Sequence, residues 1–164
     1  MAVLKIISGG QTGADRAALD FAMSHNLDCG GYCPKGRCAE DGVIDLKYPL
    51  TESPSSFYQE RTRLNIIHSE ATALFIVDGV FGKGSLFTKK QCLTNRKPLL
   101  IVDLTDNAAN LVAGFTKWIS ENKISILNIA GNREGTSPGI YRLTTEFLML
   151  VHQNTEVFCN EKTS

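Results

Sequence analysis

The chain has 164 residues, of which 43% are hydrophobic and 21% charged, as expected for one ordinary globular domain. Its 17 Lys and Arg residues balance 17 Asp and Glu residues, so the formal net charge is zero. Partners such as a nucleic-acid polymer or an anionic membrane surface favour a basic excess, and this balance argues against both. Any anion site must therefore be local.

Nothing at the N-terminus predicts secretion or membrane insertion. The opening apolar run is too short to span a bilayer, and no signal-peptide cleavage pattern follows it. The five cysteines lack the dense spacing of small secreted domains, which indicates a reduced, cytoplasmic protein. Cys29, Cys33 and Cys38 cluster, but they do not follow the C-x-x-C spacing of zinc sites and no His lies nearby, so we expect no metal site.

Short apolar runs alternate with helical patterns along the chain. This predicts a Rossmann-like α/β fold, a three-layer α/β/α sandwich with a mostly parallel sheet. Strands are expected at 3–7, 30–33, 72–77, 99–103 and 126–129, and helices at 14–26, 56–68, 84–95, 107–121 and 138–153. A single ligand-binding domain should span residues 1–153, followed by a fraying polar tail at 154–164.

Three expected helices carry specific signals. The first has small alanines on one face, which allows close approach to the sheet. The second aligns Phe57, Leu64 and Ile67 in one apolar stripe, and the last begins with Ser137 as N-cap before Pro138. Residues 34–55 have no clear period, and so long a loop inside a compact domain is often a lid or binding loop.

A glycine-rich turn joins the first strand to the first helix. Residues 8–13 nearly fit the G-x-G-x-x-G fingerprint, in which glycines let the backbone approach a phosphate at a helix N-terminus. The alternative is a tight turn closed by a capping box between Thr12 and Asp15. The candidate ligand contacts here are Gly9, Gly10, Gln11, Thr12, Gly13 and Arg16.

Two cations follow the second expected strand. An ordinary NAD site has an acidic residue there for the ribose hydroxyls, whereas this chain has Lys35 and Arg37. Both suit a phosphate or another oxyanion, and the alternative is a pair of solvated loop cations. The chain also lacks the G-K-[ST] ending of a P-loop.

Two further glycine-rich turns follow the third and fifth expected strands. Their candidate ligand contacts are Lys83, Gly84, Ser85 and Thr88 in one, and Asn132 and Arg133 in the other. Loops after parallel strands lie at one edge of the sheet, where ligands bind, so the three turns are expected to share a cleft. Arg61 and Asn65 could face it from their helix, although an exposed polar stripe is the favoured interpretation. The histidines lie near helix ends and are assigned no catalysis.

These motifs resemble those of the putative molybdenum carrier proteins. That family belongs to the Rossmann-like SLOG superfamily, together with the phosphoribohydrolases formerly called lysine decarboxylase-like. The matching stretches are 8–16, 33–37 with 39–42, 61–62 with Asn65, 82–85 with Thr88, and 128–131 with 138–141. They follow one another in order through nearly the whole chain.

The resemblance implies a carrier or sensor that binds a phosphate-bearing, nucleotide-like ligand, either a molybdenum cofactor or a nucleotide. The related phosphoribohydrolases carry a P-G-G-x-G-T-x-x-E motif, and Thr88 stands where its catalytic Glu would be. A hydroxyl cannot replace that carboxylate as an acid or base near neutral pH, so we expect binding without catalysis. The alternative is a hydrolase that cleaves an N-glycosidic bond with Asp15, Glu40 or Asp41. Relatives on this fold commonly form homo-oligomers, which is expected here too.

Overall fold

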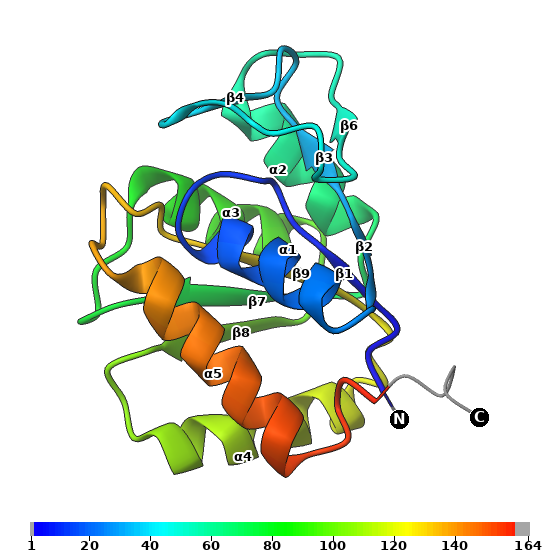
Figure 1. Cartoon of the computed structure of the whole chain (residues 1–164), viewed down its shortest axis with the longest axis vertical. Coiled ribbons are helices and arrows are strands. Elements are labelled where there is room, and N and C mark those ends of the chain that lie inside the picture. The colour runs from blue at the N-terminus through cyan, green and yellow to red at the C-terminus, as the bar shows by residue number, and fades with distance from the viewer. Residues whose placement is uncertain (1, 160–164) are drawn as a thin grey trace.

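The structure, a computed structural model, describes residues 2–159. Five parallel strands form one sheet in the order β2-β1-β9-β7-β8 (Figure 1). They are β1 (Lys5–Ile7), β2 (Asp28–Gly30), β7 (Ala71–Ile76), β8 (Leu99–Asp103) and β9 (Ile126–Gly131). The register places Ile6 opposite both Cys29 and Leu127, and Ala73 opposite both Leu100 and Ile129. The expected Rossmann-like α/β fold with a parallel sheet is confirmed.

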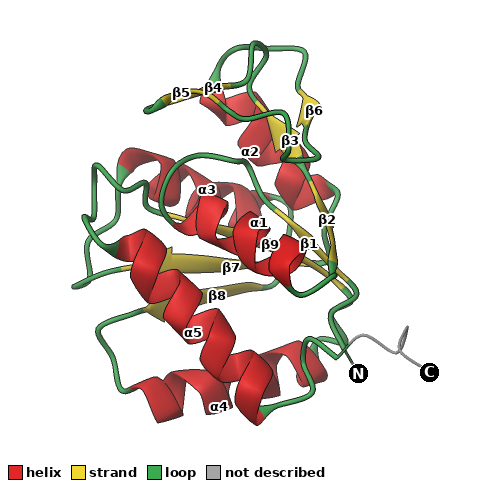
Figure 2. Ribbon diagram, viewed as in Figure 1, coloured by secondary structure: helices red, strands yellow, loops and turns green. Residues whose placement is uncertain are grey.

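Helices lie on both faces of this sheet, and one more lies beside the small module (Figure 2). The helices are α1 (Ala14–Ser24), α2 (Tyr58–Ile67), α3 (Lys83–Thr94), α4 (Ala108–Glu121) and α5 (Ile140–Asn154). Helices α1, α4 and α5 share one hydrophobic core with the sheet, whereas α3 packs on β7 and β9 from the opposite face and contacts α2. No helix among the described residues is both long enough and apolar enough to cross a membrane.

Successive side chains of β7 point to opposite faces of the sheet, and all of them are buried. Phe75 points into the core under α5, where its ring lies 5.5 Å from that of Phe147. Phe115 of α4 closes the cluster, 5.4 Å from Phe147. Burying a side chain of this size contributes about 1.5–3 kcal/mol. The small alanines of α1 are fully buried, as the sequence predicts, and let this helix lie close to β1 and β9.

The segment between β2 and α2 forms a small module above the sheet rather than one structureless loop (Figure 1). Strands β3 (Tyr32–Cys33) and β6 (Thr51–Glu52) pair in parallel, and β4 (Cys38–Ala39) and β5 (Gly42–Val43) form a short hairpin. The second expected strand, 30–33, is therefore split: its first part belongs to the main sheet and its last part to this module. Gly31, at φ +124°, makes the break.

Two expectations about the helices need correction. Helix α5 begins at Ile140, after Gly139 in the left-handed conformation, and the Glu134 carboxylate accepts from Tyr141 N at 3.0 Å where Ser137 was the expected cap. The stripe on α2 is not a core face, since Phe57 is 73% exposed and the buried positions are Asn65 and Ile66.

The C-terminal segment is ordered further than expected. Helix α5 runs to Asn154, and the expected fraying tail is part of the fold as far as Cys159. Val157 and Phe158 are buried in the main core, and Val3 N donates to the Val157 carbonyl oxygen at 2.7 Å. The rest of the expected tail, residues 160–164, lies outside the described residues.

Candidate functional site

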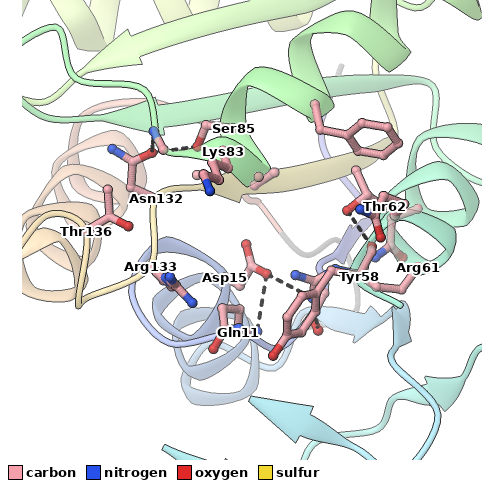
Figure 3. A pocket seen from close by; sticks show the side chains of 18 of the residues that line it. Gln11, Asp15, Tyr58, Arg61, Thr62, Lys83, Ser85, Asn132, Arg133 and Thr136 are labelled. Carbon is pink, nitrogen blue, oxygen red and sulfur yellow. Dashed lines mark hydrogen bonds and ion pairs between the residues drawn. The ribbon is translucent and has the colours of Figure 1, made fainter. Parts of the chain in front are cut away.

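A cavity of about 700 Å³ opens at the carboxyl edge of the sheet (Figure 3). The loops after β1, β7 and β9 line it together with one side of α2, so the three glycine-rich turns do share one cleft. The lining residues are Gly9, Gln11, Asp15, Tyr58, Gln59, Arg61, Thr62, Asn65, Phe81, Gly82, Lys83, Gly84, Ser85, Phe87, Asn128, Ala130, Gly131, Asn132, Arg133 and Thr136.

The N-terminus of α3 presents free backbone donors to this cavity. Gly82 is the N-cap, and the first intrahelical bond runs from Leu86 N to the Gly82 carbonyl oxygen at 3.0 Å. Within residues 2–159, the N–H groups of Lys83, Gly84 and Ser85 have no hydrogen-bond acceptor. A Cβ built on Gly84 would meet nothing within 4 Å, so the backbone is open on that side. Such a helix end, with its positive dipole, favours an anion.

The N-terminus of α1 is partly occupied by contacts within the protein. Thr12 N donates to Gln11 Oε1 at 3.0 Å, and Ala14 N donates to the Asn132 carbonyl oxygen at 3.3 Å. The N-cap is Gly13, with no side-chain cap, so the capping box weighed as an alternative does not form. Thr12 instead donates its hydroxyl to Glu40. Of the donors at this helix end, Gly13 N and Asp15 N have no acceptor within residues 2–159, so the longer run of free backbone donors lies at the α3 end.

Asp15 brings a buried carboxylate to the cavity wall. Its Oδ2 accepts from Gln11 N at 3.2 Å and lies 3.6 Å from Arg61 Nη1. Burial raises the pKa of Asp15, and the nearby Arg61 guanidinium opposes that rise. Arg61 also donates to the Gly9 carbonyl oxygen at 2.7 Å and stacks over the ring of Tyr58. The carboxylate is thus held in place from two sides.

Asn132 fixes the position of two loops relative to each other. Its Oδ1 accepts from Gly82 N at 3.0 Å and from Ser85 Oγ at 2.6 Å. Its Nδ2 donates to the Val80 carbonyl oxygen at 2.8 Å and to Ser137 Oγ at 2.9 Å. Because every polar atom of this buried amide is used within the protein, Asn132 positions the α3 N-terminus.

Two cationic side chains approach the same end of the cavity. Lys83 extends from the first turn of α3, and Arg133 extends from the loop after β9 (Figure 3). Arg133 Nε lies 3.3 Å from Glu40 Oε2, and its side chain is half-exposed. The hydrogen bond from Thr12 holds the pKa of Glu40 below its usual value, so this carboxylate stays ionised beside Arg133. Glu40 itself does not line the cavity.

Comparison with known proteins identifies the family. A profile described as "Circularly permutated YpsA SLOG family" matches residues 6–152. The chain belongs to that SLOG family. It is also similar to the "Putative molybdenum carrier protein" from Syntrophus aciditrophicus SB, whose crystal structure matches with a TM-score of 0.88 and 42% identity over 92% of this chain and 95% of that one. No curated protein matches the chain. The resemblance drawn from the motifs is therefore confirmed.

Half of the candidate contacts expected from the sequence line the cavity of this SLOG protein. They are Gly9, Gln11, Lys83, Gly84, Ser85, Asn132 and Arg133. Gly10 and Gly13 instead shape the first turn, with φ of 76° and 81°. A Cβ on Gly10 would lie 2.5 Å from Leu50, and one on Gly13 would lie 2.5 Å from the Asn132 carbonyl oxygen, so no side chain fits at either position.

The structure does not bring the other candidate contacts to the cavity. Arg37 turns inward and donates to the carbonyl oxygens of Ile44, Asp45, Tyr48 and Leu50, so it organises the module between β2 and α2. Lys35 is exposed. Arg16 donates to the Gly10 carbonyl oxygen and pairs with Asp41, and Thr88 donates its hydroxyl to the Gly84 carbonyl oxygen.

Sequence reasoning missed most of the α2 wall. The favoured interpretation of Arg61 and Asn65 as an exposed polar stripe is wrong, because the Asn65 side chain is buried and bonds both backbone groups of Tyr32. Their spacing of one helical turn was the available signal. The aromatic wall was also missed; its members are Tyr58, Phe81 and Phe87.

Proposed function

We propose that this protein binds a small, phosphate-bearing, nucleotide-like ligand in the cavity at the carboxyl edge of the sheet. The observation that carries the proposal is the N-terminus of α3, where three free backbone N–H groups and Lys83 face a cavity large enough for a nucleotide. The half-exposed Arg133 supplies a second cation. Phosphate would bind there by charge-assisted hydrogen bonds.

Aromatic residues at the cavity wall suit the rest of such a ligand. Phe81 and Phe87 border the α3 side, and Tyr58 borders the α2 side. Planar rings of a base or a pterin gain about 1–3 kcal/mol by stacking on aromatic side chains. A phosphate at one end and a planar ring system at the other define the ligand class.

The name of the Syntrophus relative describes a carrier of molybdenum. Among the described residues, no group of three or more His, Cys, Asp or Glu side chains could hold a metal ion. The α3 N-terminus and Lys83 suit an oxyanion, so the residues fit the phosphate of a molybdenum cofactor or molybdate itself rather than a bare cation. Such a molecule would be cargo, held through its oxygens.

Hydrolysis of an N-glycosidic bond is the second candidate. Asp15 favours it, because a buried carboxyl group with a raised pKa at a cavity wall is suited to acid or base catalysis. Thr88 weakens it, because its hydroxyl is bonded to the Gly84 carbonyl oxygen and offers no acid or base. Incubation with AMP, GMP, CMP and UMP, with release of free base followed by chromatography, separates the two. If free base is released faster than in buffer alone, and this release is lost in Asp15→Asn, the protein is an enzyme.

Titration calorimetry tests binding. AMP, GMP, CMP, UMP, molybdate and inorganic phosphate are titrated into the protein and into Lys83→Ala, with the exposed Lys90→Ala on the same helix as the matched control. The expected result is binding of at least one phosphorylated probe, weakened about tenfold or more in Lys83→Ala and unchanged in Lys90→Ala. Equal affinity in all three proteins would mean that the anion does not bind at the N-terminus of α3. If no probe binds at all, the proposal is overturned.

A further inference from the structure

Asp15 is the one acidic side chain among the residues that line the cavity. Its Oδ2 is engaged by Gln11 N and Arg61, the Ser8 hydroxyl also lies close to the carboxyl group, and the other oxygen points toward the cavity (Figure 3). The side chain is 8% exposed, and Arg61 opposite it is 12% exposed. A carboxylate oxygen so placed can accept hydrogen bonds from a ligand but not donate them when it is ionised.

The carboxylate cannot turn away easily. Arg61 is itself anchored to the Gly9 carbonyl oxygen at 2.7 Å, so the guanidinium keeps its position beside Asp15. A Cβ on Gly9 would lie 2.2 Å from Arg61 Nη1 and 2.9 Å from Asp15 Oδ2, which shows how closely the three groups pack. A preorganised acceptor of this kind loses little entropy when a ligand binds.

The usual acceptor for ribose hydroxyls is missing from this fold. In ordinary dinucleotide sites an acidic residue at the end of the second strand binds them. Here Gly31 follows β2, and a Cβ at that position would lie 2.2 Å from the Ser8 carbonyl oxygen, so no acidic side chain fits. Lys35 and Arg37, further along, do not line the cavity. Asp15 is therefore the carboxylate available to a sugar.

We propose that Asp15 accepts hydrogen bonds from the sugar hydroxyls of the bound ligand and so makes the site selective for ribonucleotides over 2′-deoxyribonucleotides. This inference rests on the proposed function and names the ligand class of the same cavity. With a ribonucleotide, the hydroxyl pair faces the carboxylate while the phosphate lies at the α3 N-terminus. A 2′-deoxyribonucleotide offers one hydroxyl fewer and leaves a desolvated carboxylate less well bonded, which is costly.

Matched nucleotide pairs test the inference. AMP with 2′-deoxy-AMP, and GMP with 2′-deoxy-GMP, are titrated into the protein, Asp15→Asn and Asp15→Ala, with the exposed Asp106→Asn as control. A charge-assisted hydrogen bond supports about tenfold preference for the ribonucleotide. The preference should be unchanged in Asp106→Asn, smaller in Asp15→Asn, which keeps an uncharged acceptor, and absent in Asp15→Ala.

The outcomes separate this inference from the proposed function. Nucleotides that bind at the α3 end with equal affinity for ribose and deoxyribose forms would overturn the role of Asp15 and leave the proposed function standing. Failure of every nucleotide and of inorganic phosphate to bind would overturn both. Circular dichroism checks that each variant folds, and if Asp15→Ala does not, the preference in the unmodified protein and in Asp15→Asn still decides the question.

Discussion

Arg61 Nη1 donates to the Gly9 carbonyl oxygen at 2.7 Å and lies 3.6 Å from Asp15 Oδ2. One guanidinium on α2 therefore contacts both the first glycine-rich turn and the first turn of α1. The same helix holds Tyr32 through Asn65, so α2 links the module after β2 to the sheet edge. The cavity wall and the connection between these two parts of the chain depend on the same few side chains.

Replacing Asp15 by Asn should stabilise the protein at neutral pH. Burial raises the pKa of Asp15 above its ordinary value of 3.8, so the folded state binds the proton more tightly than the unfolded state. The stability from this group is fully present below pH 3.8 and is lost as pH rises through the folded pKa. Asp15→Asn should therefore raise the Tm at pH 7.

Thermal melts from pH 3 upward check this sign. Below about pH 3.8, Asp15 is protonated in both the folded and the unfolded state, so the pH dependence of Tm should be the same for Asp15→Asn and the unmodified protein. As the pH rises, the Tm of Asp15→Asn should become the higher of the two. Arg61 keeps its bond to the Gly9 carbonyl oxygen in the variant, so its guanidinium is not left unbonded. A variant that melts lower than the unmodified protein at pH 7 would contradict the sign of the pKa shift.

Replacing Asn132 by Ala should both destabilise the fold and weaken ligand binding. The change removes four hydrogen bonds and leaves Gly82 N and Ser85 Oγ without their shared acceptor. Buried groups left unbonded in this way cost about 2–4 kcal/mol of unfolding free energy in total. Urea unfolding measures the loss, and Asn122→Ala at the exposed end of α4 should change stability by less than about 0.5 kcal/mol. Similar losses in the two variants would contradict the positioning role.

Arg37 and Lys35 should behave differently although they lie two residues apart. Arg37 donates to four carbonyl oxygens of the module between β2 and α2. Arg37→Ala should therefore lower the free energy of unfolding by about 2–4 kcal/mol and speed amide hydrogen exchange at residues 44–50. Lys35→Ala should leave stability within about 0.5 kcal/mol and nucleotide affinity unchanged. A loss of affinity in Lys35→Ala would instead support the lid that the sequence predicts.

Alkaline pH should destabilise the contact between α1 and α5. Tyr141 donates its hydroxyl to Asp20 Oδ2 at 2.6 Å, and burial together with this bond raises the pKa of Tyr141 from 10 to about 12. The folded state thus retains the phenolic proton longer than the unfolded state, and unfolding free energy falls as pH rises from 10 to 12. Urea unfolding of Tyr141→Phe should show a shallower fall than that of Tyr58→Phe. If the unfolding free energies of the two variants fall equally between pH 10 and 12, the Tyr141–Asp20 hydrogen bond does not contribute as proposed.

The parallel sheet and the shared cleft were predictable because they rest on local patterns. Buried alanines at helical spacing identify α1, and a glycine-rich turn after a strand identifies a carboxyl-edge loop wherever it occurs. The start of α4 was predicted to within one residue. The expected helix began at Asn107, and Asn107 is the N-cap, whose side chain accepts from Asn110 N.

Contacts between distant segments were not predictable in the same way. The two-residue strands of the module carry no periodic signal, and Arg37 finds its carbonyl partners only after the chain between 44 and 50 has curled around it. Nor does sequence reveal that Glu134 takes over the capping of α5 from Ser137, because that depends on Gly139 adopting a left-handed conformation.

Backbone amide chemical shifts during titration with AMP test the central claim most directly. If the phosphate binds at the N-terminus of α3, the N–H signals of Lys83, Gly84 and Ser85 should show the largest changes, because these donors are free before binding. The signals of Thr12 and Ala14, whose donors are already bonded within the protein, should change less. Saturable changes centred on residues 83–85 are the predicted result. Changes centred instead on residues 35–37, or none at millimolar AMP, would contradict the account.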